Sequence, residues 1–166
     1  MGGKQMLNKF SYKYLFSYSA DIGEFHRMKE SPLGLRTIGY ISGGSGWGDV
    51  LNGELLPGGG DWCVLRKDGV SCPDVRALIK TDSGAEIFMH YTGRMDTGTN
   101  GYENYCNDVF PDVNFICTAV DLETEDDEFM WLNRKQCFGI GQVDRTKTPV
   151  KVQYDVYALT SLPDDA

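Results

Sequence analysis

The chain has 166 residues, a length that one hydrophobic core commonly serves, so a single domain spanning residues 1–166 is expected. It carries 16 Lys and Arg against 24 Asp and Glu, and this net charge of −8, with no basic cluster to reverse it, disfavours a nucleic-acid partner. The first twenty residues hold no apolar run of the length that a signal peptide or a membrane helix requires, so neither secretion nor membrane insertion is expected.

The N-terminal third of the chain alternates strand-forming and turn-forming segments. Residues 10–18 alternate aromatic with polar side chains, and this two-residue period predicts a half-buried strand. Residues 35–41 predict a second strand, which is expected to end at the Gly-rich segment 42–48. Residues 51–56 then lead into residues 57–60, a Pro-Gly-Gly-Gly breaker that predicts a turn.

Two hairpins are predicted in the middle of the chain. Residues 62–65 run towards Asp68 and Gly69, and Asp-Gly is a strong signal for a tight turn between two strands. Residues 75–80 and 85–91, separated by a short Asp-Ser-Gly turn, predict the second hairpin. Short strands joined in this way are typical of antiparallel sheets.

A long polar segment and a final group of strands complete the chain. Residues 94–112 are rich in polar side chains and too long for a hairpin loop, so they are a candidate lid. Residues 1–9 are expected to form a flexible N-terminus. The remaining strands are predicted over residues 114–122, 129–132, 136–140 and 150–159.

The number and spacing of these strands predict an all-β fold. About eight to ten short strands with hairpin spacing form either a sandwich or a barrel, and closure removes exposed strand edges. A single closed antiparallel barrel with little helix is therefore the expected fold. An eight-stranded barrel is about the size at which the interior is either filled by side chains or holds one small ligand, so the fold alone leaves both open.

Residues 53–62, with the sequence Gly-Glu-Leu-Leu-Pro-Gly-Gly-Gly-Asp-Trp, resemble a motif of the domain-of-unknown-function family 3237, found in bacteria and fungi. The resemblance spans nearly the whole chain from about Phe10 and implies a closed antiparallel barrel, without implying a settled reaction. Further segments agree with the family in the same order: Asp68-Gly69, Asp74-Val75-Arg76, residues 81–87, Trp131-Leu132-Asn133, Gly139-Ile140-Gly141 and residues 152–159.

Asp61 and Trp62 form the first candidate site, because three preceding glycines let the backbone approach a ligand at a barrel mouth. The alternative is structural, with Trp62 plugging the barrel end and Asp61 capping the turn. Arg76 alternates with an apolar face, which by simple alternation places it in solvent. The family pattern and a wet interior would instead turn Arg76 inward, where its guanidinium needs a carboxylate or a ligand anion.

His90 and Asn133 complete the predicted catalytic set with Asp61 and Arg76. A histidine side chain changes charge near neutral pH and suits acid–base work, although a lone strand histidine is more often structural. Asn133 is a candidate to polarise a carbonyl or steady an enolate, against an equally weighted role as a turn residue. The predicted substrate-binding residues are Tyr40, Trp62, Phe88, Tyr91 and Trp131.

The sequence predicts neither a metal nor an organic cofactor. Its two histidines lack HxH or HExxH spacing, the Gly-rich segment 43–48 is not G-x-G-x-x-G, and no G-x-S-x-G elbow is present. Five scattered cysteines fit reduced thiols in the cytoplasm.

The leading hypothesis is a cofactor-independent isomerase, cyclase or lyase that moves protons within an aromatic or polyketide-like molecule of secondary metabolism. The alternatives are a non-catalytic binding or carrier barrel and an interaction module with a solid interior. The expected partner is a small molecule, and a homo-oligomer is left open.

Overall fold

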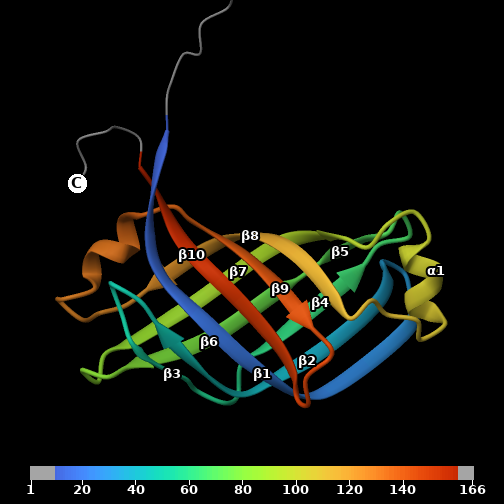
Figure 1. Cartoon of the computed structure of the whole chain (residues 1–166), viewed down its shortest axis with the longest axis horizontal. Coiled ribbons are helices and arrows are strands. Elements are labelled where there is room, and N and C mark those ends of the chain that lie inside the picture. Colours follow the sequence, from blue (N-terminus) through green and yellow to red (C-terminus); the bar gives the residue numbers. More distant parts are fainter. Residues whose placement is uncertain (1–9, 161–166) are drawn as a thin grey trace, which may run out of the picture.

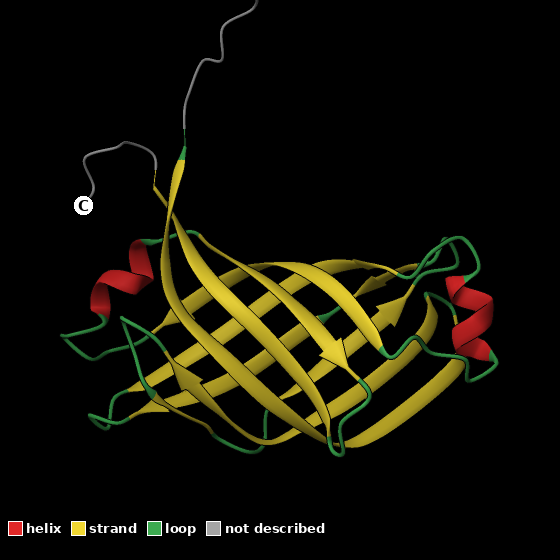
Figure 2. Ribbon diagram, viewed as in Figure 1, coloured by secondary structure: helices red, strands yellow, loops and turns green. Residues whose placement is uncertain are grey.

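Two long N-terminal strands close the sheet on itself. The strand β1 (Ser11–Ser31) pairs with the last strand of the chain and also with β2 (Gly34–Trp47), so neither end of the strand order is left as a free edge. The computed structural model describes residues 10–160, and all the pairings in this part of the chain are antiparallel (Figures 1 and 2). The other strands are β3 (Gly53–Leu55), β4 (Gly60–Leu65), β5 (Val70–Cys72), β6 (Asp74–Thr81), β7 (Glu86–Asp96), β8 (Val113–Glu123), β9 (Cys137–Asp144) and β10 (Val150–Thr160).

The prediction of a closed antiparallel barrel with little helix is confirmed. Ten strands make the barrel, and the described residues contain one α-helix, α1 (Gly101–Cys106), and one 3-10 helix, η1 (Met130–Arg134). The two helices lie at opposite ends of the barrel (Figure 2). Neither helix has the length and hydrophobicity needed to cross a membrane.

Both predicted hairpins form. Gly69 has a φ of 82° in the turn between β4 and β5, and Gly84 has a φ of 94° in the turn between β6 and β7. These values lie in the left-handed region, which glycine occupies at little cost because it lacks a Cβ. The Asp-Gly and Asp-Ser-Gly signals therefore set the strand boundaries through backbone geometry.

The Gly-rich segment 42–48 was expected to end the second strand. Instead it continues β2 as far as Trp47. A Cβ on Gly44 would overlap the carbonyl oxygen of Ser19 on β1. The glycines here allow two strands to approach closely, which is a role that composition alone does not separate from chain breaking.

The first strand also differs from its expected pattern. Its pairing with β10 shifts register between Tyr14 and Phe16, which interrupts the two-residue period. Tyr14 packs edge-on against Tyr157 with ring centroids 5.8 Å apart, while Phe16 and Tyr18 are buried. The predicted single aromatic face is thus split between the outside and the inside of the barrel.

Residues 129–132 were predicted as a strand, but residues 130–132 are part of η1, whose Leu132 is buried in the core. The predicted lid segment contains α1, and β7 extends into its start as far as Asp96. The predicted flexible N-terminus, residues 1–9, lies outside the described residues.

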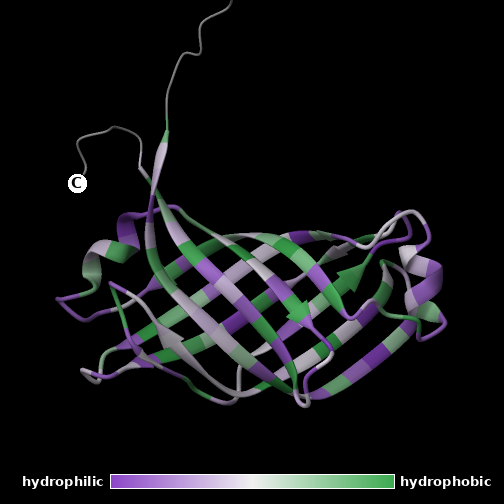
Figure 3. Ribbon diagram, in the orientation of Figure 1, coloured by the Kyte–Doolittle hydropathy of each residue, from purple (hydrophilic) through white to green (hydrophobic). Residues whose placement is uncertain are grey.

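The interior is packed at one end of the barrel. Hydrophobic and polar residues alternate along the strands (Figure 3), so every second side chain faces inward. The η1 end is filled by side chains that are less than 2% exposed, namely Leu15, Phe16, Ile79, Ile87 and Leu132. At the α1 end a smaller buried cluster consists of Leu35, Leu65 and Tyr105.

Candidate functional site

A cavity of about 370 Å³ lies inside the barrel towards α1. Most of the side chains that line it are apolar, and Tyr105 of α1 and Phe110 border it at the helix end. Small residues on facing strands, including Ala20 and Ala77, leave this space open. A volume in this range suits a small organic molecule.

Asp61 is the single carboxylate among the described residues that line the cavity. Alternation along β4 turns Asp61, Cys63 and Leu65 inward and Trp62 outward. The Asp61 Oδ1 accepts a hydrogen bond of 3.0 Å from the backbone N–H of Asp74. Asp61 is half-buried.

Burial raises the pKa of Asp61 from 3.8 to about 7. Desolvation of the carboxylate is the largest cause, the hydrogen bond from the Asp74 backbone opposes it, and the negative charge of Asp74 adds to it. Both protonation states are therefore populated near neutral pH, which is the condition that an acid–base group requires.

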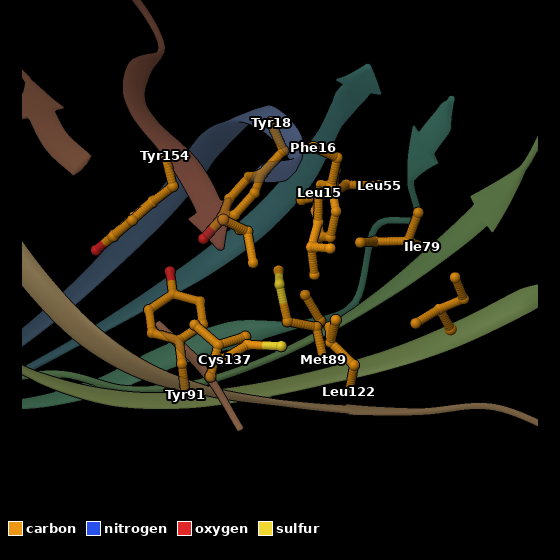
Figure 4. Close-up of a cluster of buried hydrophobic side chains, with 14 of the residues drawn as sticks. Leu15, Phe16, Tyr18, Leu55, Ile79, Met89, Tyr91, Leu122, Cys137 and Tyr154 are labelled. Atoms are coloured by element: carbon orange, nitrogen blue, oxygen red, sulfur yellow. The ribbon is translucent and has the colours of Figure 1, made fainter. Parts of the chain in front are cut away.

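Three tyrosines lie together in the cavity wall, as Figure 4 shows. The Tyr18 and Tyr154 rings stack with centroids 5.3 Å apart, and the Tyr91 and Tyr154 centroids are also 5.3 Å apart. Burial raises the pKa of all three phenols, and the charge of Asp61 raises them further, so they stay neutral O–H donors. The Tyr18 hydroxyl is buried and has no hydrogen-bond partner among residues 10–160.

Two glycines of β9 make room for the Tyr154 ring. A Cβ on Gly139 would lie 3.1 Å from the Tyr154 Cδ1 atom, and a Cβ on Gly141 would overlap the same ring. The Gly-Ile-Gly sequence at this point therefore positions an aromatic wall of the cavity.

Replacing Tyr18 with Phe is expected to leave the ligand-free protein equally stable or to stabilise it by about 1 kcal/mol, because the change removes an unpaired buried hydroxyl. Urea unfolding of the two proteins measures this difference. A loss of more than about 2 kcal/mol would show that the hydroxyl has a partner in the folded protein. Tyr12→Phe is the matched control, because Tyr12 is exposed and removing its hydroxyl leaves the interior unchanged.

The structure brings two of the predicted site residues, Asp61 and Tyr91, to the cavity. Arg76 and His90 lie on the outer face of the barrel, because the strand alternation that turns their neighbours inward turns them outward. The Asp74 Oδ1 is 3.0 Å from Arg76 Nη1 and 3.1 Å from His90 Nε2. The expectation that Arg76 turns into the barrel is corrected accordingly.

The other predicted residues also lie away from the cavity. Arg76 stacks over the Trp62 ring at 5.5 Å on the outside, so Trp62 does not plug the barrel end. The Asn133 Oδ1 accepts a hydrogen bond of 2.9 Å from the Thr124 backbone N–H, and the Asn133 Nδ2 donates one of 2.8 Å to the Thr124 carbonyl oxygen. The Asn133 amide therefore has a structural role and not the proposed catalytic one. Three further side chains are 37–38% exposed and do not line the cavity: Tyr40, Phe88 and Trp131.

Sequence reasoning missed Tyr18, Tyr154 and two arginines that line the cavity, Arg27 and Arg145. The sequence contained a signal for Tyr154, because this residue carries a hydroxyl group and lies on the apolar face of the last predicted strand. The arginines carried no such signal, because they lie near strand ends and reach the cavity only when β1 and β9 meet α1. No group of three or more His, Cys, Asp or Glu side chains in the described part of the chain is arranged to hold a metal ion.

A family model described as "Protein of unknown function (DUF3237)" matches residues 10–159. A UPF0311 protein of Rhodopseudomonas palustris (strain TIE-1) is 28% identical over 122 residues, which cover 72% of this chain and 80% of that protein.

Two solved structures share the fold. A protein with unknown function from Clostridium acetobutylicum has a TM-score of 0.81 at 22% identity, covering 92% of this chain and 100% of its own. A structure described as an enzyme from Penicillium herquei has a TM-score of 0.65 at 18% identity, covering 93% of this chain and 98% of its own. With the family match reaching from the first described residue into the last strand, the chain belongs to the DUF3237 family.

Proposed function

We propose that the protein is a cofactor-independent enzyme, of the isomerase, cyclase or lyase type, that moves a proton within a small molecule held in the barrel. The observation that carries this proposal is the position of Asp61, an isolated carboxyl group in a mainly apolar cavity. A carboxyl group in that position that titrates near pH 7 can both accept and return a proton under physiological conditions.

The proposed chemistry needs only side chains of the cavity. As a carboxylate, Asp61 takes a proton from one atom of the ligand, and as a carboxylic acid it delivers that proton to another atom. The protein therefore returns to its starting state without an oxidant or a reductant. Tyr91 lines the same cavity and stays a neutral O–H donor, so its hydroxyl donates a hydrogen bond to an oxygen that gains negative charge during this transfer.

The ligand class follows from the walls of the cavity. Stacked Tyr18 and Tyr154, together with Phe25 and Phe110, favour a flat aromatic or polyketide-like molecule. The Penicillium herquei protein of the same fold is described as an enzyme, which supports catalysis in a barrel of this kind. We retain the cytoplasm as the proposed location and a small molecule as the proposed partner.

Native mass spectrometry of the untreated protein tests the proposal by identifying a co-purified ligand. That compound is then incubated with the protein in D2O, and deuterium uptake or conversion is followed by mass spectrometry. We expect protein-dependent deuterium incorporation or conversion well above the solvent rate. Tight binding of the compound with neither event would contradict catalysis and favour the alternative, a carrier barrel.

A further inference from the structure

Two arginines line the α1 end of the cavity, and they differ in their partners. Arg27 already has a carboxylate partner, because it forms an ion pair with Asp108, which also binds Lys29 at 3.0 Å. Arg145 has no carboxylate within ion-pair distance in residues 10–160. Its guanidinium therefore keeps a full positive charge at the cavity wall.

The hydrogen bonds of Arg145 all go to neutral acceptors. Its Nη1 donates to the Asn114 Oδ1 at 2.6 Å and to the Pro111 carbonyl oxygen at 3.3 Å, and its Nη2 donates to the Tyr105 hydroxyl at 3.2 Å. The Nε–H and one Nη2–H are left without a partner in the part of the chain that the structure describes. The Nε and Nη2 atoms form one edge of the planar guanidinium, and this edge can bind a carboxylate with two parallel hydrogen bonds.

Two aromatic rings hold this guanidinium in place. Its central carbon lies 5.6 Å from the centroid of the Tyr105 ring and 5.7 Å from that of Phe110. Arg145 is partly buried, and partial burial costs less free energy when the guanidinium is paired with an anion. The chain carries an excess of carboxylates, yet none of the described ones lies within 4.0 Å of the Arg145 guanidinium, which leaves this group available to an anionic ligand.

We propose that Arg145 binds the carboxylate of an aromatic acid whose apolar body fills the cavity towards Asp61. This inference rests on the proposed function and deepens it, because it names the substrate class of the same cavity. Arg145 acts here as a specificity-determining residue. The arrangement places a fixed positive charge at the helix end of the ligand and the proton-transferring group deeper in the barrel.

A matched pair of probes, 2-naphthoate and its neutral isostere 2-naphthamide, tests this inference by isothermal titration calorimetry. The titrations are run at pH 6, where Asp61, with its pKa of about 7, is mostly protonated and does not repel the anion. We expect the natural protein to bind naphthoate about ten- to one hundredfold more tightly than naphthamide. Arg145→Gln is expected to abolish this preference.

Arg134→Gln is the matched control, because Arg134 is exposed on η1 at the opposite end of the barrel and its loss changes the net charge equally. It is expected to keep the preference. Arg145→Lys, which keeps the charge without the planar fork, is expected to show a preference reduced several-fold and serves as the test if the Gln variant does not fold.

Three results would overturn the inference: equal affinity of the natural protein for the two probes, binding of neither probe, or a preference that is undiminished in the Arg145 variants. The titration involves no proton transfer, so it succeeds or fails independently of the deuterium experiment. Deuterium exchange without a charge preference would remove only the anion site, and a charge preference without exchange would remove only the catalytic proposal.

Discussion

Replacing Asp61 with Asn is expected to lower turnover of the bound ligand by about a hundredfold to ten-thousandfold. Asn is nearly isosteric, and its Oδ1 can still accept the 3.0 Å hydrogen bond from the Asp74 backbone, so the cavity keeps its shape. What the variant loses is the group that exchanges a proton. Turnover and affinity are measured with the co-purified ligand, and we expect affinity to change far less than turnover.

The same variant is expected to be more stable than the natural protein above pH 7. The pKa of Asp61 is about 7 in the folded protein and 3.8 in the unfolded chain. Between pH 3.8 and pH 7, Asp61 is therefore protonated in the folded protein and ionised in the unfolded chain. The stability of the natural protein therefore falls as pH rises through this window. The Asn variant has no such fall, so its advantage at pH 8 reaches at most about 4 kcal/mol and disappears towards pH 4.

Urea unfolding at pH 5 and pH 8 measures this advantage. Asp82→Asn is the control, because Asp82 is exposed in the turn between β6 and β7 and its carboxylate is solvated in both states. Two results would contradict the catalytic role: lower stability of the Asp61→Asn variant at pH 8, or turnover of the ligand at the natural rate. Either result would favour the alternative role of Asp61, which is to cap the turn.

The strand period and the glycine signals were sufficient to predict the barrel, but they placed few of the site residues. Asp61 was found because three glycines precede it, whereas Tyr91 was proposed only for its hydroxyl, and the face of the strand on which it lies was left unassigned. Arg76 and His90 were misplaced when a wet interior was preferred to simple alternation. On the outer face the Asp74 carboxylate pairs with the Arg76 guanidinium and lies 3.1 Å from the His90 Nε2 atom, so both side chains have a partner without turning inward.

The position of the cavity is a long-range property that local sequence does not contain. Small side chains from distant strands, such as Gly39, Ala20 and Ala77, face the same space only after β1 pairs with β2 and β6 pairs with β7. The other half of the barrel is filled because a bulge places Leu15 and Phe16 in the core and η1 inserts Leu132. Neither the bulge in β1 nor the insertion of a short helix into the barrel end can be recognised from the two-residue hydrophobic period of the sequence.

Gly141→Ala is expected to destabilise the protein by about 1–3 kcal/mol or more. The added methyl group would overlap the carbonyl oxygen of Gln153 on β10 and the ring of Tyr154, so either the strand pair or the ring must move. A shifted Tyr154 also loses its stacking on Tyr18, which would weaken the near-ultraviolet circular dichroism of the tyrosines and reduce ligand affinity.

Gly46→Ala separates this effect from the general cost of replacing a strand glycine. Its Cβ would meet its nearest neighbour, the Leu51 Cδ1 atom, at 3.5 Å, an ordinary contact, so stability should change by less than about 1 kcal/mol. Equal effects of the two variants in urea unfolding would mean that Gly141 acts only through strand propensity. A selective loss at Gly141, together with weaker ligand binding, would show that the Gly-Ile-Gly segment builds the aromatic wall against which the ligand lies.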